Sequence, residues 1–107
     1  MELSQYEIIL INLDPAIGSE RKKTRPCVII SPDELNEYLR TITIAPITSQ
    51  SHNYPTRVKI NLDGKTNWLV LDQIRTVDKT RVIKRINKLT QQEAIRCKAV
   101  IKETFVD

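Results

Sequence analysis

The chain is poor in the residues that build metal centres and disulfide frameworks. Its 107 residues include two cysteines and one histidine, and no CxxC pair is present. This excludes the usual zinc-binding spacings, and we expect no structural metal. Cys27 and Cys97 lie far apart in apolar patterns, where a reduced thiol behaves as a small hydrophobe. We therefore expect both cysteines in the core.

Long hydrophobic runs are also missing. The longest unbroken ones are the four-residue runs Ile8 to Ile11 and Cys27 to Ile30, whereas a membrane-spanning helix needs roughly 20 apolar residues. The N-terminus, MELSQYE, has neither the basic start nor the apolar stretch of a secretory signal. These absences predict a cytoplasmic chain with no membrane association.

No repeat, low-complexity tract or linker interrupts the sequence, and the two glycines and five prolines are scattered. A hydrophobic share of 40% is enough for one core in a chain of this length. We expect one domain covering residues 1–107.

Short runs rich in Ile, Val and Thr recur along the chain and predict strands. In one of them, Thr56 to Leu62, apolar and polar residues alternate strictly, which predicts one buried and one solvated face. Asp63-Gly64 follows at once and predicts a tight antiparallel turn. The expected strands are Tyr6–Leu13, Cys27–Ser31, Thr41–Ile47, Thr56–Leu62, Trp68–Gln73 and Val82–Ile86.

Two segments carry helix signals. Ser31-Pro32-Asp33-Glu34 predicts a short helix capped by the serine and ending near Leu39. Thr90-Gln91-Gln92-Glu93 is a second capping box, and it predicts a terminal helix that closes the core. Its expected buried face consists of Ala94, Cys97, Ile101 and Phe105. Many short strands with two helices predict a mainly β, α+β fold: a small, mostly antiparallel barrel or half-barrel.

Positive charge is concentrated in two places. The stretch from Arg75 to Lys88 holds six basic residues against one acid, and the loop from Asp14 to Arg25 holds four against two. The net charge of the whole chain is only +4, which does not indicate what kind of molecule it binds. The distribution suggests two basic patches that could converge.

Three segments could carry chemistry, and each has an ordinary structural alternative. Arg25 precedes Pro26 at the root of the basic loop, where an anchored guanidinium could hold a phosphate, although charge runs usually just face water. Thr48 and the polar residues after it suit phosphate or base contacts, although such clusters often only form turns. Asp72 and Arg75 lie near the second basic stretch, where they could simply pair. We expect His52 to be an exposed loop residue, and Trp68 to pack more than to stack on a base.

Four segments in order, LDPAIGSERKKTRP, APITSQS, NYPTRVKI and LDQIRTVDK, resemble the MazF/PemK family of toxin endoribonucleases. The resemblance is clearest from Tyr6 through Lys79 and implies a small SH3-like barrel of the PemK/CcdB toxin type with a C-terminal helix. It further implies a homodimer, an acidic MazE-like antitoxin, and cleavage of single-stranded mRNA at a short sequence without metal or other cofactor. The expected products are a 2′,3′-cyclic phosphate and a 5′-hydroxyl, with inhibition of translation and growth as the result.

By this resemblance, the family's catalytic arginine falls on Arg25 and its catalytic hydroxyl on Thr48, and Glu20 and Asp72 rank second. One branch has a histidine where Ser19 stands and an arginine where Val70 stands, so its acid–base assignment does not transfer whole. We leave the general base open, because Glu20 could take the proton or merely orient Arg25. The residues expected to bind substrate are Ser19, Lys22, Lys23, Ser49, Gln50, Ser51 and Arg75.

Two other functions remain open on the sequence. A related toxin branch with the same barrel poisons DNA gyrase without enzymatic activity, and this would not require Arg25 or Thr48. A catalytically silent RNA-binding module would use the basic stretches only to hold the backbone.

Overall fold

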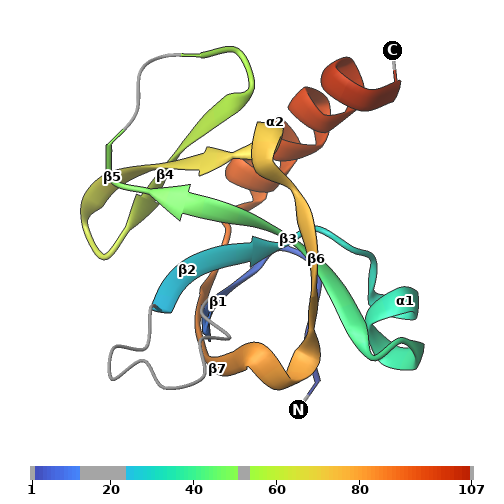
Figure 1. Cartoon of the computed structure of the whole chain (residues 1–107). Helices are drawn as coiled ribbons and strands as arrows, with labels where there is room; N and C mark the ends of the chain where they lie inside the picture. The colour runs from blue at the N-terminus through green and yellow to red at the C-terminus, as the bar shows by residue number, and fades with distance from the viewer. Residues whose placement is uncertain (1, 13–23, 51–53, 107) are drawn as a thin grey trace.

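The computed structural model describes residues 2–12, 24–50 and 54–106 (Figure 1). Seven strands form one curled sheet, with a short helix at one end and a longer C-terminal helix against one face. The strands are β1 (Glu7–Asn12), β2 (Thr24–Ile29), β3 (Thr41–Thr48), β4 (Arg57–Leu62), β5 (Lys65–Val70), β6 (Arg75–Asp78) and β7 (Val82–Lys88). The helical elements are α1 (Asp33–Tyr38), α2 (Gln91–Ile101), the 3₁₀ turns η1 (Leu71–Gln73) and η2 (Lys79–Arg81), and a π-helical extension, η3 (Lys102–Val106).

The strand order is β4-β5-β3-β2-β1-β7, and the paired strands are antiparallel. β3 is long enough to be shared along one edge. Its first half pairs with β6, from Thr41↔Asp78 to Ile44↔Arg75, and its end pairs with β5. This sharing curls the sheet into a half-barrel, which confirms the predicted fold class.

The curled sheet has a hydrophobic cluster on each face. On the outer face, side chains such as Val28, Ala45 and Leu69 pack with Cys97 of α2. On the inner face, Ile9, Cys27, Ile44 and others form the second cluster. Neighbours in sequence, such as Cys27 and Val28, therefore enter different clusters, as strand alternation requires. Both cysteines are buried free thiols, as predicted.

Two local predictions are confirmed in detail. Thr90 Oγ1 accepts a hydrogen bond from Glu93 N at 3.1 Å, and Glu93 Oε1 accepts one from Thr90 N at 2.9 Å, which completes the capping box of α2. Asp63 and Gly64 form the β4–β5 hairpin with φ values of 54° and 77°. Positive φ at both central residues is typical of a type I′ turn.

Other local predictions need correction. Ser31 does not cap α1: the cap position is Pro32, and the Ser31 hydroxyl instead donates to Asn36 and accepts from Thr43 N. Strand β5 ends at Val70 rather than Gln73, because the chain turns into η1. β6 was not predicted, since its four residues include one buried side chain, Val77. Phe105 is 58% exposed, so the buried face of the helix ends before it.

Within residues 2–12, 24–50 and 54–106, no helix is both long and apolar enough to cross a membrane.

Candidate functional site

Arg25 lies on β2, one residue after that strand begins at Thr24. Its backbone pairs with Ile11 of β1, and its side chain is exposed. The following Pro26 keeps Arg25 extended, so the guanidinium projects from an ordered strand end. This is the anchored position that the sequence predicts.

Thr48 is the last residue of β3 and is half-buried. Its Oγ1 donates to Gln50 O at 3.0 Å and accepts from Gln50 N at 3.2 Å. The hydroxyl therefore holds the turn that ends β3, as the structural alternative predicted. This does not remove it from the site, because the same side chain also lines two cavities.

Arg25 and Thr48 meet at both of these cavities. One, of about 160 Å³, is lined by Arg25, Pro46, Thr48, Gln50, Arg57, Val70 and Gln73. The other, of about 250 Å³, is lined by Thr24, Arg25, Pro26, Ile47, Thr48, Ser49 and Asn67. We call these together the Arg25–Thr48 groove, at the end of the sheet where β2 begins and β3 ends (Figure 1).

The pairing of β2 with β3 explains why these side chains meet. Cys27 pairs with Pro46, and continuing this register by two residues sets Arg25 opposite Thr48. Directly opposed residues of antiparallel strands project to the same face. Arg25 and Thr48 therefore lie on the face of Cys27 and the inner cluster. The smaller cavity opens on that face, whereas the larger one is also lined by Ile47 of the outer cluster.

Arg57 is a groove residue that sequence reasoning did not select. Alternation placed it on the polar face of its strand, but only the pairing of Arg57 with Val70 brings it toward Arg25. Its Nε lies 3.5 Å from Asp72 Oδ1, and its guanidinium carbon lies 5.0 Å from the centre of the Tyr54 ring. Gln73 was also missed as a lining residue, since the sequence pattern places it only at the end of a predicted strand.

Asp72 does not line either cavity of the groove. It pairs with Arg57, rather than with Arg75 as the sequence suggested, and its Oδ1 also accepts a hydrogen bond from Thr56 Oγ1 at 2.9 Å. Desolvation raises the pKa of this carboxyl, but the hydrogen bonds from Thr56, the Asp72 backbone and Arg57 outweigh it and hold the pKa below 3.8. Asp72 is therefore ionised at neutral pH.

The other described candidates are arranged around this centre. Ser49 and Gln50 are exposed at the end of β3, each lining one cavity. Arg75 pairs with Ile44 on the neighbouring edge of β3. Burial raises the pKa of the Cys27 thiol to about 12, and the positive charges of Arg25 and Arg75 oppose that rise. Ser19, Glu20, Lys22, Lys23, Ser51 and His52 lie outside the described residues.

The second basic stretch does not reach the groove as a unit. β7 pairs with β1 at the edge of the sheet opposite β4, and Arg85 lies 3.7 Å from the Glu7 carboxylate. Arg81 Nη1 donates to Asn12 O at 3.4 Å, next to the start of β2. Two residues of this stretch come nearest to β2: Arg75, opposite Ile44 of β3, and Arg81, which contacts the residue paired with Thr24.

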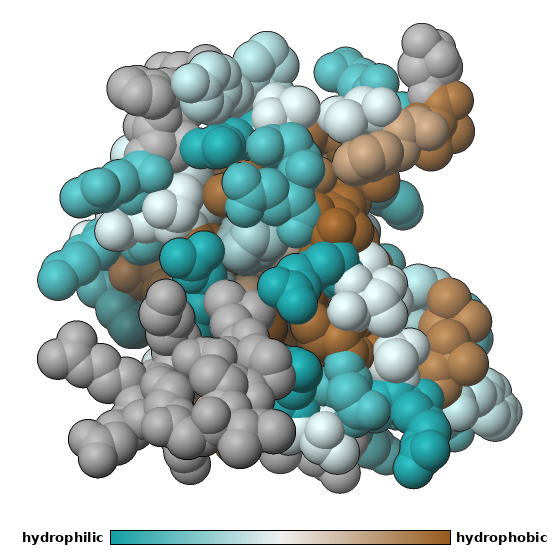
Figure 2. All heavy atoms as spheres, in the orientation of Figure 1, coloured by the Kyte–Doolittle hydropathy of each residue, from teal (hydrophilic) through white to brown (hydrophobic). Residues whose placement is uncertain are grey.

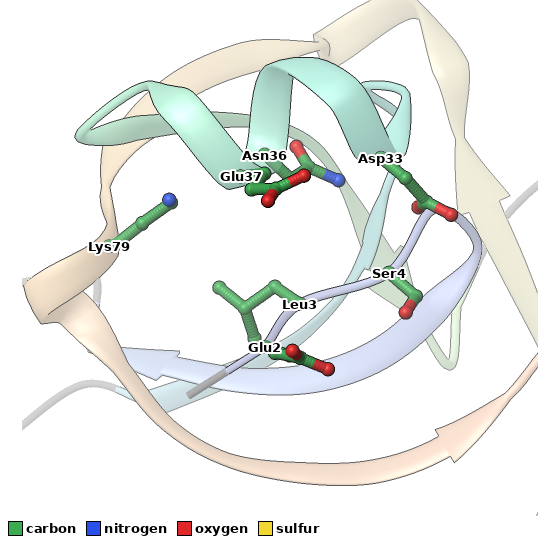
Figure 3. A pocket seen from close by; sticks show the side chains of 7 residues that line it. All are labelled: Glu2, Leu3, Ser4, Asp33, Asn36, Glu37 and Lys79. Atoms are coloured by element: carbon green, nitrogen blue, oxygen red, sulfur yellow. The ribbon is translucent and has the colours of Figure 1, made fainter.

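A larger cavity of about 310 Å³ lies at α1, away from these residues (Figure 3). Carboxylates and the Lys79 ammonium surround it, and Leu3 closes it from the side of the N-terminal segment. Asp33 is already engaged, since its Oδ1 accepts from Gln5 N at 2.7 Å. None of the predicted site residues within the described part of the chain lines this cavity. Among the described residues, no group of three or more His, Cys, Asp or Glu side chains is placed to hold a metal ion.

Comparison with known proteins places the chain in one family. The sequence model for the "PemK-like, MazF-like toxin of type II toxin-antitoxin system" matches residues 4–105. The endoribonuclease MazF of Staphylococcus saprophyticus is 36% identical over 81% of this chain and 78% of its own length. The Staphylococcus epidermidis endoribonuclease MazF is also 36% identical, over 83% of this chain and 79% of its own.

Solved structures show the same fold at lower identity. A Deinococcus radiodurans MazE–MazF structure superimposes with a TM-score of 0.82 at 19% identity, covering 96% of this chain and 95% of that one. The Mycobacterium tuberculosis toxin MazF-mt6 gives 0.77 at 21% identity, covering 92% and 95%. Matched by the family model along nearly its whole length, this chain belongs to the PemK-like, MazF-like toxins of type II toxin–antitoxin systems.

Proposed function

We propose that this chain, a MazF-like endoribonuclease, cleaves single-stranded mRNA at a short sequence without a metal and thereby inhibits translation and growth. The observation that carries the proposal is that Arg25 and Thr48 line the same two cavities. The curated relatives at 36% identity are endoribonucleases, which favours this activity over gyrase poisoning or silent RNA binding.

The proposed chemistry uses the substrate's own 2′-hydroxyl as the nucleophile. Its proton leaves to a base, the O2′–P bond forms, the P–O5′ bond breaks, and the 5′ oxygen takes up a proton. The products are a 2′,3′-cyclic phosphate and a 5′-hydroxyl. DNA has no 2′-hydroxyl and would resist cleavage.

Arg25 suits the charge that develops on the phosphoryl oxygens as the hydroxyl attacks. A guanidinium is planar, permanently charged and able to contact two oxygens at once. Because it projects from an ordered strand end, little reorganisation is needed when the phosphate arrives. Thr48 would supply a second donor by turning its hydroxyl proton from Gln50 O, 3.0 Å away, toward the phosphate.

The supporting residues have less direct roles. Arg57 would add positive charge at the wall of the groove, where Asp72 holds it by an ion pair of 3.5 Å. Because Asp72 is already paired and its pKa is low, we assign it to positioning Arg57 rather than to proton transfer. Glu20, which the family resemblance selects, remains the candidate for the base.

Selectivity would come from polar groups around the groove, since unpaired bases expose their hydrogen-bonding edges. Gln50, Ser49 and Arg75 are the described residues placed for this. Ser19, Lys22, Lys23 and Ser51 complete the set that the sequence selects.

Two partners are part of the proposal. A mycobacterial endoribonuclease with this fold has been solved with its cognate antitoxin. Here an acidic, initially disordered peptide would bind the cationic groove and compete with RNA. The second partner is another copy of the chain, with which it would form a homodimer. Large apolar side chains are exposed at the C-terminal helix: Ile95 at 59%, Phe105 at 58% and Val106 at 73%. Figure 2 shows this hydrophobic surface at the upper right, along the C-terminal helix.

The direct test is incubation of purified protein with a long single-stranded RNA in excess chelator, followed by mapping of the cleaved ends. We expect cleavage at one short sequence, leaving 2′,3′-cyclic phosphate ends, and no cleavage of DNA with the same sequence. Intact RNA across varied sequences would contradict the proposal.

A further inference from the structure

Trp68 is the only tryptophan of the chain, and its position in the sheet is unusual for so large an apolar residue. It is half-buried and packs against neither of the two core clusters. Its neighbour Leu69 is fully buried in the outer cluster. Because side chains alternate along a strand, Trp68 projects to the opposite face, which is the face of Thr48. It lines neither cavity of the groove and lies beside them. Trp68 therefore lies outside both core clusters, and its packing role stays a prediction.

The register of three strand pairs sets Trp68 in a row with the catalytic candidates. Trp68 pairs with Thr48 of β3 on one side and with Lys59 of β4 on the other. Continuing the register of β2 and β3 two residues beyond the Cys27–Pro46 pair sets Arg25 opposite Thr48. The row Arg25–Thr48–Trp68–Lys59 thus crosses four neighbouring strands on one face, with strands about 4.8 Å apart.

Lys59 is the last residue of this row, on the edge strand β4, and its side chain is exposed to solvent. In contrast, Val58 and Ile60 on either side of it are buried in the cluster packed by α2. Lys59 therefore projects to the face of Thr48 and Trp68. An indole flanked by a hydroxyl and an ammonium resembles the alternation of aromatic and cationic groups in single-strand binding sites.

The indole N–H of Trp68 makes no hydrogen bond within the described residues. Its nitrogen, Nε1, is buried. A buried Trp N–H usually finds an acceptor, and leaving it unpaired costs free energy. The position of the indole is therefore not fixed by any hydrogen bond of its N–H.

We propose that Trp68 and Lys59 extend the RNA site beyond Arg25 and Thr48, with an unpaired base next to the scissile phosphate stacking on the Trp68 indole and the adjoining phosphate contacting the Lys59 ammonium. The proposal rests on the ribonuclease function above and states that the bound RNA continues from Thr48 across Trp68 to Lys59. It makes Trp68 a residue that sets affinity and local base preference, without a role in bond breaking.

The single tryptophan allows a direct measurement. The probe is a DNA oligonucleotide with the mapped cleavage sequence and a fluorescent label, which has no 2′-hydroxyl and stays intact. We expect saturating probe to quench Trp68 emission, and Trp68→Ala to weaken binding about ten- to hundredfold in label anisotropy. Trp68→Phe should keep most of the affinity, whereas Trp68→Leu, which can still fill space, should not.

Stacking on one particular base can be separated from a general packing effect. Probes lacking one base at a time around the cleaved position are compared with wild-type protein and Trp68→Ala. We expect Trp68→Ala to cause no loss of affinity for one of these probes, because that probe lacks the base that stacks on Trp68. A loss of equal size on every probe would overturn the stacking role.

Lys59 is tested by the salt dependence of binding. Removal of one phosphate contact should lower the slope of log affinity against log salt by about 0.7. We expect this for Lys59→Ala but not for Lys79→Ala, whose ammonium faces the separate cavity at α1. An unchanged slope for Lys59→Ala would overturn its phosphate contact.

The outcomes distinguish this proposal from the ribonuclease function. If RNA is cleaved at a defined sequence but the bound probe leaves Trp68 emission and Trp68→Ala affinity unchanged, only the extended site is wrong. If no RNA is cleaved, the ribonuclease proposal fails first and the extended site fails with it. Tyr38→Ala is the matched aromatic control, because Tyr38 is 81% exposed on α1, and it should change neither binding nor cleavage.

Discussion

At the residue scale, Arg25 and Thr48 differ in how they are held. Arg25 is exposed at an ordered strand end, free to meet a phosphate, while the Thr48 hydroxyl already bridges to Gln50. The first side chain can therefore be removed without loosening the fold. Removal of the second would also release the turn that ends β3.

We predict that Arg25→Ala lowers RNA cleavage by about a hundredfold or more, since one donor to a developing oxyanion contributes about 3 kcal/mol. The thermal midpoint should stay unchanged, because Arg25 is exposed. Arg25→Lys keeps the charge but loses the planar fork, so it should restore little activity. Arg40→Ala, an exposed arginine between α1 and β3, is the control. An Arg25→Ala variant with full kcat would refute the assignment.

We predict that Asp72→Asn and Arg57→Ala weaken substrate binding by similar amounts and that the double variant is no worse than either. The reason is that Asp72 acts through Arg57, to which it is hydrogen-bonded. The measurement is KM and kcat of the three variants. Additive losses, or a loss confined to kcat for Asp72→Asn, would indicate a direct role for the carboxylate.

The two thiols should be protected in the folded protein. Burial raises the pKa of both Cys27 and Cys97 to about 12, from the ordinary 9.0. The folded state disfavours the thiolate. The two thiols therefore reduce the free energy of unfolding only above pH 9, where they ionise in the unfolded chain, and increasingly so as the pH rises toward 12. We predict slow labelling by a thiol reagent at pH 8, rapid labelling in denaturant, and falling stability above pH 9. Rapid native labelling would contradict the buried placement.

At the scale of elements, α2 is attached to the sheet through its first turn. Glu93 is buried, caps the helix through Oε1, and accepts a hydrogen bond from Asn61 N of β4 at 2.8 Å through Oε2. One carboxylate therefore orders both the helix start and the strand beneath it. This contact holds the helix over the outer face, opposite the groove.

We predict that Thr90→Ala destabilises the protein by about 1 kcal/mol, the usual value of a helix cap. For a domain of this size the thermal midpoint should fall by about 4–8 °C. Gln92→Ala, exposed in the same turn, should have little effect. The comparison is made by urea and thermal unfolding, with cleavage activity of both variants unchanged at low temperature. Equal stability of Thr90→Ala and wild type would show that the box contributes nothing.

At the scale of the whole molecule, two surfaces of opposite character remain uncovered. The groove side carries Arg25, Arg57 and Lys59, and the C-terminal helix exposes Ile95, Phe105 and Val106. Figure 2 shows both characters in one view, hydrophilic to the left and hydrophobic at the upper right. A polar groove suits RNA or an acidic peptide, and an apolar surface suits a second copy of the chain.

We predict a solution mass about twice the 12.4 kDa of one chain, measured by light scattering. Phe105→Asp should shift the protein toward a monomer, because an exposed apolar side chain would be replaced by a charge at the interface. Glu34→Lys, an exposed charge reversal on α1, is the control. A monomeric wild-type protein, or a dimer unaffected by Phe105→Asp, would rule out this surface.

Local patterns alone determined much of this protein. Alternation from Thr56 to Leu62, the Asp63-Gly64 turn and the Thr90–Glu93 box each depend on residues a few positions apart, so the sequence predicts them correctly. The family resemblance, and no local pattern, selected Arg25 and Thr48, whose roles stay a prediction. These features need no knowledge of which strands pair.

Only the tertiary structure decided the rest, because it depends on pairings between distant segments. The register of β2 with β3 and of β3 with β5 and β4 determines that Arg25, Thr48 and Trp68 share one face. The pairing of Arg57 with Val70 brings an unselected arginine to the groove. A shift of one residue in any of these pairs would send the side chain to the other face, and no local pattern specifies that register.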